Sequence, residues 1–304
     1  MKYIEWLNIW LENYVKPSVK VRTYERYALI IEKHIANDIG EYEINTLSAL
    51  ILQNYITKLL QNGNYKTGQG LSANSVNSII SLIQNSLRTA NMLEITKEYT
   101  ADKIKRPKLT EKPVECFSMQ EQKQIEYAVL NSKKDKLLGI LLCLYSGLRI
   151  GELIALQWND IDLTKGILTV SKSCHDSKYG LVIDEPKTIN SRRLIPLPKQ
   201  LLPILKAQKK HSCSDYVVSA NDKPISVRSY QRSFELLLKK LKITHKGFHS
   251  LRHTFATRAL ECGMDVKTLS EILGHKNPTI TLNRYAHSLM EHKQDMMNKL
   301  GKLL

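Results

Sequence analysis

Residues 249 to 257 read His249-Ser-Leu-Arg252-His253-Thr-Phe-Ala-Thr257 and form a predicted helix that ends at Cys262-Gly263. His249 and Arg252 are three residues apart, so they project from one helix face and can address one phosphate together. His249 and His253 also have the i, i+4 spacing of zinc ligands on a metalloprotease helix. Such a site needs a Glu directly after the first His, but Ser250 stands there, so we expect no metal. The segment predicts phosphate binding.

Two segments upstream carry further cations. In Ser146-Gly-Leu-Arg149-Ile-Gly-Glu152, Arg149 directly follows a predicted buried helix. Its planar fork can hold two phosphate oxygens, which a lysine cannot do, but it is equally suited to cap a helix or to pair with Glu152. In Glu185-Pro-Lys187-Thr-Ile-Asn-Ser191-Arg-Arg193, Lys187 lies between two strand-like runs. We expect Lys187 on an exposed hairpin turn, where it is either solvated or placed to protonate a leaving 5′ oxygen in a DNA groove.

The last segment, from Leu273-Gly274-His275 to Tyr285-Ala-His287, holds a candidate nucleophile. Gly274 is expected to end one helix, and Asn277 and Pro278 are good N-cap and N1 residues for the next, with Tyr285 about two turns later. A tyrosine here is either core packing or a nucleophile. Because a phenol is weakly nucleophilic at neutral pH, a catalytic Tyr285 requires a neighbouring base and cationic surroundings.

Composition agrees with a polyanionic partner. The 304 residues carry a formal net charge of +16. Residues 1–115 hold 15 basic and 12 acidic side chains, whereas residues 116–304 hold 30 and 17, so the second part should make most phosphate contacts. Five cysteines without a C-x-x-C pair favour neither disulfides nor structural zinc. The longest apolar run, 137–145, is too short to cross a bilayer, and we expect a soluble cytoplasmic protein.

The spacing of apolar residues divides the chain into two parts. Helical spacing dominates first: Tyr24, Tyr27 and Ile31 share one face, 46–60 reads as a helix, and a longer stripe follows the N-cap Ser72. The segment 106–116, with two prolines and several charges, is typical of a linker. After a capping box at Ser118, a buried helix gives way to short β-rich runs at 166–170, 181–183 and 193–197, and helical spacing returns after residue 226.

Arg149, Lys187, the His249-x-x-Arg252 pair, His275 and Tyr285 together resemble the active-site set of the tyrosine recombinases, or phage integrases. Each segment alone is a weak signal, but all of them in this order and spacing are specific, and no active-site position departs from the pattern. The first domain resembles the family's core-binding domain at Trp10-Leu11 and at the helix start 70–72. From the resemblance we expect that the small arm-binding domain, which many integrases carry ahead of the core-binding domain, is missing, and the sequence leaves open whether it is naturally absent or was removed.

The resemblance implies a mainly α fold with a small antiparallel β-sheet in the catalytic domain, and a two-domain C-shaped clamp around DNA. It implies a helical, SAM-like core-binding domain at 1–105, a linker at 106–116, and a catalytic domain at 117–304. A tail helix is expected at 288–304, with Leu289, Met296, Leu300 and Leu303 near one face. The tail is expected to dock on a neighbouring subunit, although folding back on its own domain stays open.

The implied activity is site-specific recombination by a bacterial mobile-element integrase, through a 3′-phosphotyrosyl intermediate and a Holliday junction. Tyr285 would be the nucleophile, Lys187 the general acid and His249 the base. Arg149 and Arg252, supported by His275, would stabilise the pentavalent phosphate. No cofactor, metal or ATP is implied. The implied partners are double-stranded DNA core sites and three further copies in a homotetramer, and an accessory directionality factor is a further candidate.

Two other classes stay open from the sequence. A type IB topoisomerase uses similar chemistry, but a core-binding domain is not expected there, and relaxation of a plasmid without recombination sites would favour it. A non-catalytic DNA-binding protein explains the basic charge but not a nucleophile, an acid and an arginine pair, and failure to form a covalent DNA adduct would favour it. The DNA site, the strand stagger and the choice between element integrase and chromosome-dimer resolvase also stay open.

Overall fold

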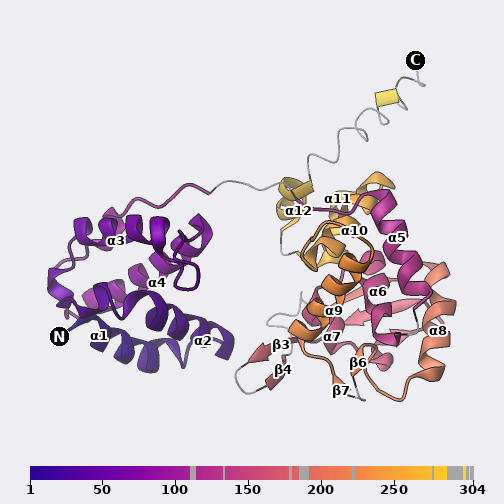
Figure 1. The fold of residues 1–304 in the computed structure, drawn as a ribbon, viewed down its shortest axis with the longest axis horizontal. Helices are drawn as coiled ribbons and strands as arrows, with labels where there is room; N and C mark the ends of the chain where they lie inside the picture. Colours follow the sequence, from indigo (N-terminus) through magenta and orange to yellow (C-terminus); the bar gives the residue numbers. More distant parts are fainter. Residues whose placement is uncertain are drawn as a thin grey trace. The chain divides into compact units, whose positions relative to one another are not determined.

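The computed structural model describes residues 1–109, 114–132, 134–177, 180–184, 192–220, 223–275, 277–285, 297–298 and 301. The chain divides into two compact units, Met1–Lys112 and Pro113–Leu304, and the division falls inside the segment 106–116 that we expected to be a linker (Figure 1). Most of the expected tail helix 288–304 lies outside the described residues. In the described part of the chain, no helix combines the length and the apolar character that crossing a membrane requires.

The first unit is helical, as expected. Its α-helices are α1 Tyr3–Trp10, α2 Val21–Ile30, α3 Ala49–Asn62 and α4 Ala73–Met92. The hydroxyl groups of Ser48 and Ser72 accept hydrogen bonds from backbone N–H groups in the first turns of α3 and α4, which explains why α3 begins three residues later than its apolar pattern suggested. Helices α1, α3 and α4 bury one face each in a common core that includes Trp6, Leu52 and Ile80.

Residues at the start of the segment 106–116, and Phe117 directly after it, are bound to the unit on their own side. Arg106 donates from Nη2 to Gln84 Oε1 (2.6 Å) on α4, and Asn77 Nδ2 of the same helix donates to the Pro107 carbonyl (3.1 Å). At the other end, the Phe117 backbone N–H donates to Thr254 Oγ1 at 2.9 Å in the second unit. Hydrogen bonds thus hold Arg106 and Pro107 to the first unit and Phe117 to the second.

The second unit is built around one buried helix. Its helices are α5 Met119–Leu130, α6 Leu138–Ser146, α7 Ile150–Ala155, α8 Leu202–His211, α9 Val227–Lys240, α10 His249–Glu261, α11 Val266–Leu273 and α12 Pro278–Tyr285. Helix α6 is apolar on all sides, and eight of its nine residues are buried. It packs against α5, α7 and α10, so the elements that follow it are held on a rigid base (Figure 1).

The described strands are short and antiparallel. They are β1 Ile161–Asp162, β2 Ile167–Val170, β3 Ser173–Ser177, β4 Gly180–Asp184, β5 Arg193–Pro196, β6 Ser219–Ala220 and β7 Lys223–Pro224. They form a three-stranded sheet β1-β2-β5 and two separate hairpins, β3-β4 and β6-β7. The fold class is thus confirmed, with three small sheets among the described residues where one was expected.

Strands β4 and β5, which lie on the two sides of the segment expected to form a hairpin turn around Lys187, do not pair with each other, and the turn itself lies outside the described residues. Strand β4 pairs with β3, and β5 pairs with β2. The β3-β4 hairpin is drawn onto helices instead: Gly151 of α7 leaves space for the Cys174 carbonyl, which a Cβ there would meet at 2.4 Å. The Asp176 carboxylate accepts from the backbone N–H groups of Val227 (3.1 Å) and Arg228 (3.0 Å) at the start of α9.

Candidate active site

Arg252 lies at the centre of the candidate site. It extends from the first turn of α10 into the interior, where only 2% of its surface stays exposed. Its Nη1 donates to the Gly147 carbonyl and its Nη2 to the Leu273 carbonyl, both at 2.7 Å. Gly147 adopts a left-handed conformation with φ +65°, which a glycine tolerates, and it ends α6 immediately before the Arg149 segment. Arg252 therefore joins the ends of α6 and α11.

His275 connects this arginine to the helix that carries Tyr285. Its Nε2 lies 3.0 Å from Arg252 Nη2, and its Nδ1 lies 2.7 Å from Thr281 Oγ1. Because a guanidinium can only donate, Nε2 accepts here, and Nδ1 then carries the proton and donates to Thr281. Thr281 is fully buried in α12. The turn after α11 is thereby fixed to the helix that ends at Tyr285.

Arg149 both caps a helix and pairs with Glu152, and it also lies where a phosphate-binding residue is expected. It is the N-cap residue of α7, and its backbone N–H donates to Glu152 Oε2 at 2.8 Å. Its Nη1 donates to Glu152 Oε1 at 2.8 Å, so the pairing with Glu152 is real. The same side chain also reaches the Gly274 carbonyl, 3.5 Å from Nη2, next to His275. Arg149 thus lies in the same site as Arg252.

Glu152 binds a third arginine that we did not single out in the sequence. Arg193 donates from Nη1 and Nη2 to the two oxygens of Glu152, at 3.0 and 2.8 Å, and from Nε to the Ile272 carbonyl at 2.6 Å. The side chains of Arg193 and Glu152 are only 7% and 8% exposed. Burial alone raises the pKa of Glu152, but the hydrogen bonds and charges of Arg193 and Arg149 outweigh it and lower this pKa to about 2. The carboxylate is therefore ionised throughout the neutral range.

The C-terminal end of α11 brings the three arginines together. The carbonyl groups of Ile272, Leu273 and Gly274, three consecutive residues, accept from Arg193, Arg252 and Arg149 respectively. The last carbonyls of a helix lack partners within the helix and form the negative end of its dipole, so they attract cations. Three guanidinium groups beside one carboxylate leave this part of the site positively charged, as an anionic phosphate requires.

Three further candidates, His249, Lys187 and Tyr285, are described less completely than the residues around the end of α11. His249 is the first residue of α10, is exposed, and packs its ring edge-on against His253 with centroids 4.6 Å apart. Lys187 lies outside the described residues. Tyr285 is the last residue of α12, and only its backbone position is described. Among the described residues, no group of three or more His, Cys, Asp or Glu side chains is arranged to hold a metal ion.

A signal for Arg193 was present in the sequence. Alternate residues of a strand point to the same side, so Arg193 belongs to the same side as Ile195, which is buried. A charged side chain on the inner face of a strand needs a buried partner, and Glu152 supplies it. Thr281 offered no comparable signal, because its role depends on the position of His275.

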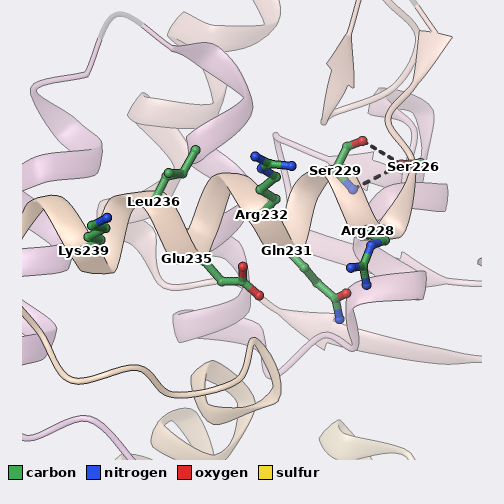
Figure 2. A pocket seen from close by; sticks show the side chains of 8 residues that line it. All are labelled: Ser226, Arg228, Ser229, Gln231, Arg232, Glu235, Leu236 and Lys239. Atoms are coloured by element: carbon green, nitrogen blue, oxygen red, sulfur yellow. Dashed lines mark hydrogen bonds between the residues drawn. The ribbon is translucent and has the colours of Figure 1, made fainter. Parts of the chain in front are cut away.

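A second surface of this unit offers a place for a polyanion. The exposed side of α9 borders a groove of about 640 Å³ that Arg228, Arg232 and Lys239 line together with Gln231 and Glu235 (Figure 2). The three cations recur at helical spacing on one helix. The groove carries more positive than negative charge, in agreement with the charge excess of the second part of the chain.

Comparison with known proteins identifies the family. Residues 117–292 match the phage integrase family, and residues 3–60 match the phage integrase N-terminal SAM-like domain. A tyrosine recombinase XerC-like protein of Caldanaerobacter subterraneus subsp. tengcongensis is 28% identical over 98% of this chain and 82% of its own. The ICEBs1 integrase of Bacillus subtilis is 29% identical over 94% of this chain and 79% of its own.

A solved structure agrees in fold. The Tn1549 transposon integrase, in complex with a circular intermediate DNA, superimposes with a TM-score of 0.83 over 99% of both chains at 22% identity. The family match covers more than half of the chain and includes every residue of the candidate site. The chain therefore belongs to the phage integrase family and is a tyrosine-type site-specific recombinase.

Proposed function

We propose that this protein is the integrase of a bacterial mobile element, acting in the cytoplasm on double-stranded core sites, and that Tyr285 is its nucleophile. One observation supports the assignment of the site: Arg149 and Arg252 meet at the end of α11, and His275 links Arg252 through Thr281 to α12. Residues four apart lie on one helix face, so Tyr285 belongs to the face of α12 on which Thr281 meets His275.

The proposed first step exchanges one phosphate ester for another. The Tyr285 oxygen attacks the scissile phosphorus, a bond to this oxygen forms, and the bond to the 5′ oxygen breaks. His249 takes the phenol proton, and Lys187 gives a proton to the departing 5′ oxygen. Arg149 and Arg252 donate hydrogen bonds to the non-bridging oxygens, where negative charge accumulates, and His275 supports them.

The second step reverses the first with a new strand. A 5′-hydroxyl of the partner duplex attacks the 3′-phosphotyrosyl bond and releases Tyr285. Since the energy of the broken bond is kept in the protein link, no ATP is consumed. A first pair of exchanges leaves a Holliday junction, and a second pair resolves it.

DNA binding and assembly follow from the same proposal. The two units would clamp the duplex in a C shape, and the groove along α9 would contribute cationic contacts to it. Four strands must be cut, so four protomers are needed, and the tail 288–304 would dock on the neighbouring protomer. A directionality factor would act on this assembly rather than on the chemistry.

Trapping of the covalent intermediate tests the assignment. Nicked duplexes carrying the DNA next to the gene lose the short strand after cleavage, which leaves the protein attached to DNA. Wild type should form this adduct, Tyr285→Phe should bind the duplex without forming it, and Tyr127→Phe, which alters a 72% exposed tyrosine on α5, should behave as wild type. An adduct that persists in Tyr285→Phe would show that the nucleophile is misassigned.

A further inference from the structure

Arg193 occupies a place in the site that the proposed reaction does not yet use. Its guanidinium is almost completely buried, and each of its three nitrogens donates to a protein oxygen. A side chain held in this way acts through its neighbours and not by touching the substrate. Its backbone is equally fixed, because Arg193 pairs with Val170 in the ladder between β5 and β2.

We propose that Arg193 is a positioning residue that holds Arg149 in its reactive orientation through Glu152. The inference rests on the proposed function, since Arg149 is one of its phosphate-binding residues. Glu152 receives the two parallel N–H groups of Arg193 on both oxygens, and it receives Arg149 on the same two atoms. Arg193 thus fixes the carboxylate from one side while Arg149 uses it from the other.

Electrostatics explains why a second cation is needed. A carboxylate as buried as Glu152 loses most of its hydration, and it stays charged only when buried partners compensate for that loss. Arg149 is 41% exposed, so it compensates weakly, and the exposed part of its guanidinium can meet a phosphate while Glu152 holds it. Arg193 supplies the compensation from the buried side. In this way Glu152 can orient Arg149 without drawing it into the interior.

Arg193 also contacts the end of α11. Arg193 Nε donates to the Ile272 carbonyl, and its side chain packs over Gly274, where a Cβ would meet Arg193 Cδ at 3.1 Å. Gly274 has φ +65°, a conformation that favours glycine. The adjacent Leu273 carbonyl holds Arg252. Arg193 therefore connects the Glu152–Arg149 pair to the end of α11, so Arg149 is placed relative to the helix end that Arg252 holds independently through the Leu273 carbonyl.

A double-mutant cycle tests the inference. Arg193→Lys keeps the charge but loses the fork, so Glu152 is held at one point only. Single-turnover cleavage of the nicked duplex should slow by about 100-fold, because a displacement of about 1 Å in the reacting groups costs that much. In an Arg149→Ala background the same substitution should add no further loss, since the residue through which it acts is gone. DNA binding should be retained in every variant of the cycle.

Arg258→Lys is the matched control. Arg258 also donates to three protein groups, namely Gln122, Glu261 and the Phe117 carbonyl, but it touches neither Glu152 nor the end of α11 in these contacts. It should lose stability to a similar degree and keep its cleavage rate. A general structural role of Arg193 would instead slow cleavage by the same factor with and without Arg149.

Three results would overturn the inference: an unchanged rate in Arg193→Lys, equal slowing in both backgrounds, or equal slowing in Arg258→Lys. If Arg193→Lys does not fold, Glu152→Asp carries the test, because a shorter carboxylate cannot reach both arginines, and an unchanged rate there contradicts the inference. If wild type itself forms no adduct, the proposed function has failed and not the role of Arg193.

Discussion

Replacing Glu152 by Gln should destabilise the second unit by an amount that depends on pH in a defined way. In the folded protein, burial raises the pKa of Glu152, yet Arg193 and Arg149 lower it from the usual value near 4.5 to about 2. At about 1.4 kcal/mol per pH unit, a lowering of this size corresponds to about 3 kcal/mol of folding free energy at neutral pH. A glutamine also turns an N–H group toward one of the arginines, where no acceptor remains.

The sign of the pH dependence follows from the lowered pKa. A carboxyl group with a lower pKa in the folded state stabilises the fold above its unfolded pKa, and this contribution disappears as pH falls toward the folded pKa. The difference in unfolding free energy between wild type and Glu152→Gln should therefore be full above about pH 4.5 and should shrink toward pH 2. Other carboxyl groups titrate in both proteins and cancel in the difference.

Urea denaturation of both proteins over this range gives the difference, with pulse solvent labelling of α6 peptides so that only unfolding of the second unit is followed. Asp162→Asn is a suitable control, because Asp162 also has a lowered pKa but is an exposed residue at the end of β1, where it accepts from backbone N–H groups of the following turn. A glutamine variant that is as stable as wild type at neutral pH, or a difference that stays constant down to pH 2, would refute the reasoning.

Three further predictions address the chemistry and the assembly. Cleavage should survive exhaustive chelation, because in the proposed mechanism Arg149, Arg252 and His275 bind the phosphate in place of a metal, and loss of activity in EDTA with recovery on adding Mg²⁺ or Zn²⁺ would contradict this. A sulfur in the 5′ leaving position departs without protonation, so this substrate should restore cleavage by Lys187→Ala but much less by His249→Ala. Equal rescue of both variants would contradict the assignment of Lys187 as the acid and His249 as the base. Truncation after His287 should leave a protein that binds DNA but forms tetramers and recombinant products poorly, and undiminished tetramer assembly on DNA would exclude docking of the tail on a neighbour.

Local rules predicted most of the helices of the described chain. Ser72, and the capping box of Ser118 with Glu121, mark the starts of α4 and α5, and the structure confirms both caps. The apolar run at 137–145 is the buried α6, and Gly274 ends α11 as expected. Such features depend on a few neighbouring residues, so they can be derived from sequence. The resemblance to the tyrosine recombinases is confirmed by the family match.

Features that depend on contacts between distant segments could not be derived in the same way. The sequence predicted a hairpin of the two strands on either side of Lys187. In the structure β4 pairs with β3 instead, and this hairpin contacts Gly151 of α7 and the N-terminus of α9. Arg193 on β5 binds Glu152 of α7, which is 41 residues away along the chain, and the Ile272 carbonyl of α11, which is 79 residues away. Only the rule that a buried charge needs a partner could have pointed to Arg193.

Mapping the attachment of DNA on the protein shows directly whether Tyr285 is the nucleophile. The covalent complex is trapped on a nicked duplex, digested with nuclease and protease, and analysed by mass spectrometry for peptides that carry a residual nucleotide. We expect one modified peptide, with the nucleotide linked through its 3′ phosphate to the oxygen of Tyr285. A nucleotide on any other residue, or linkage through a 5′ phosphate, would contradict the account.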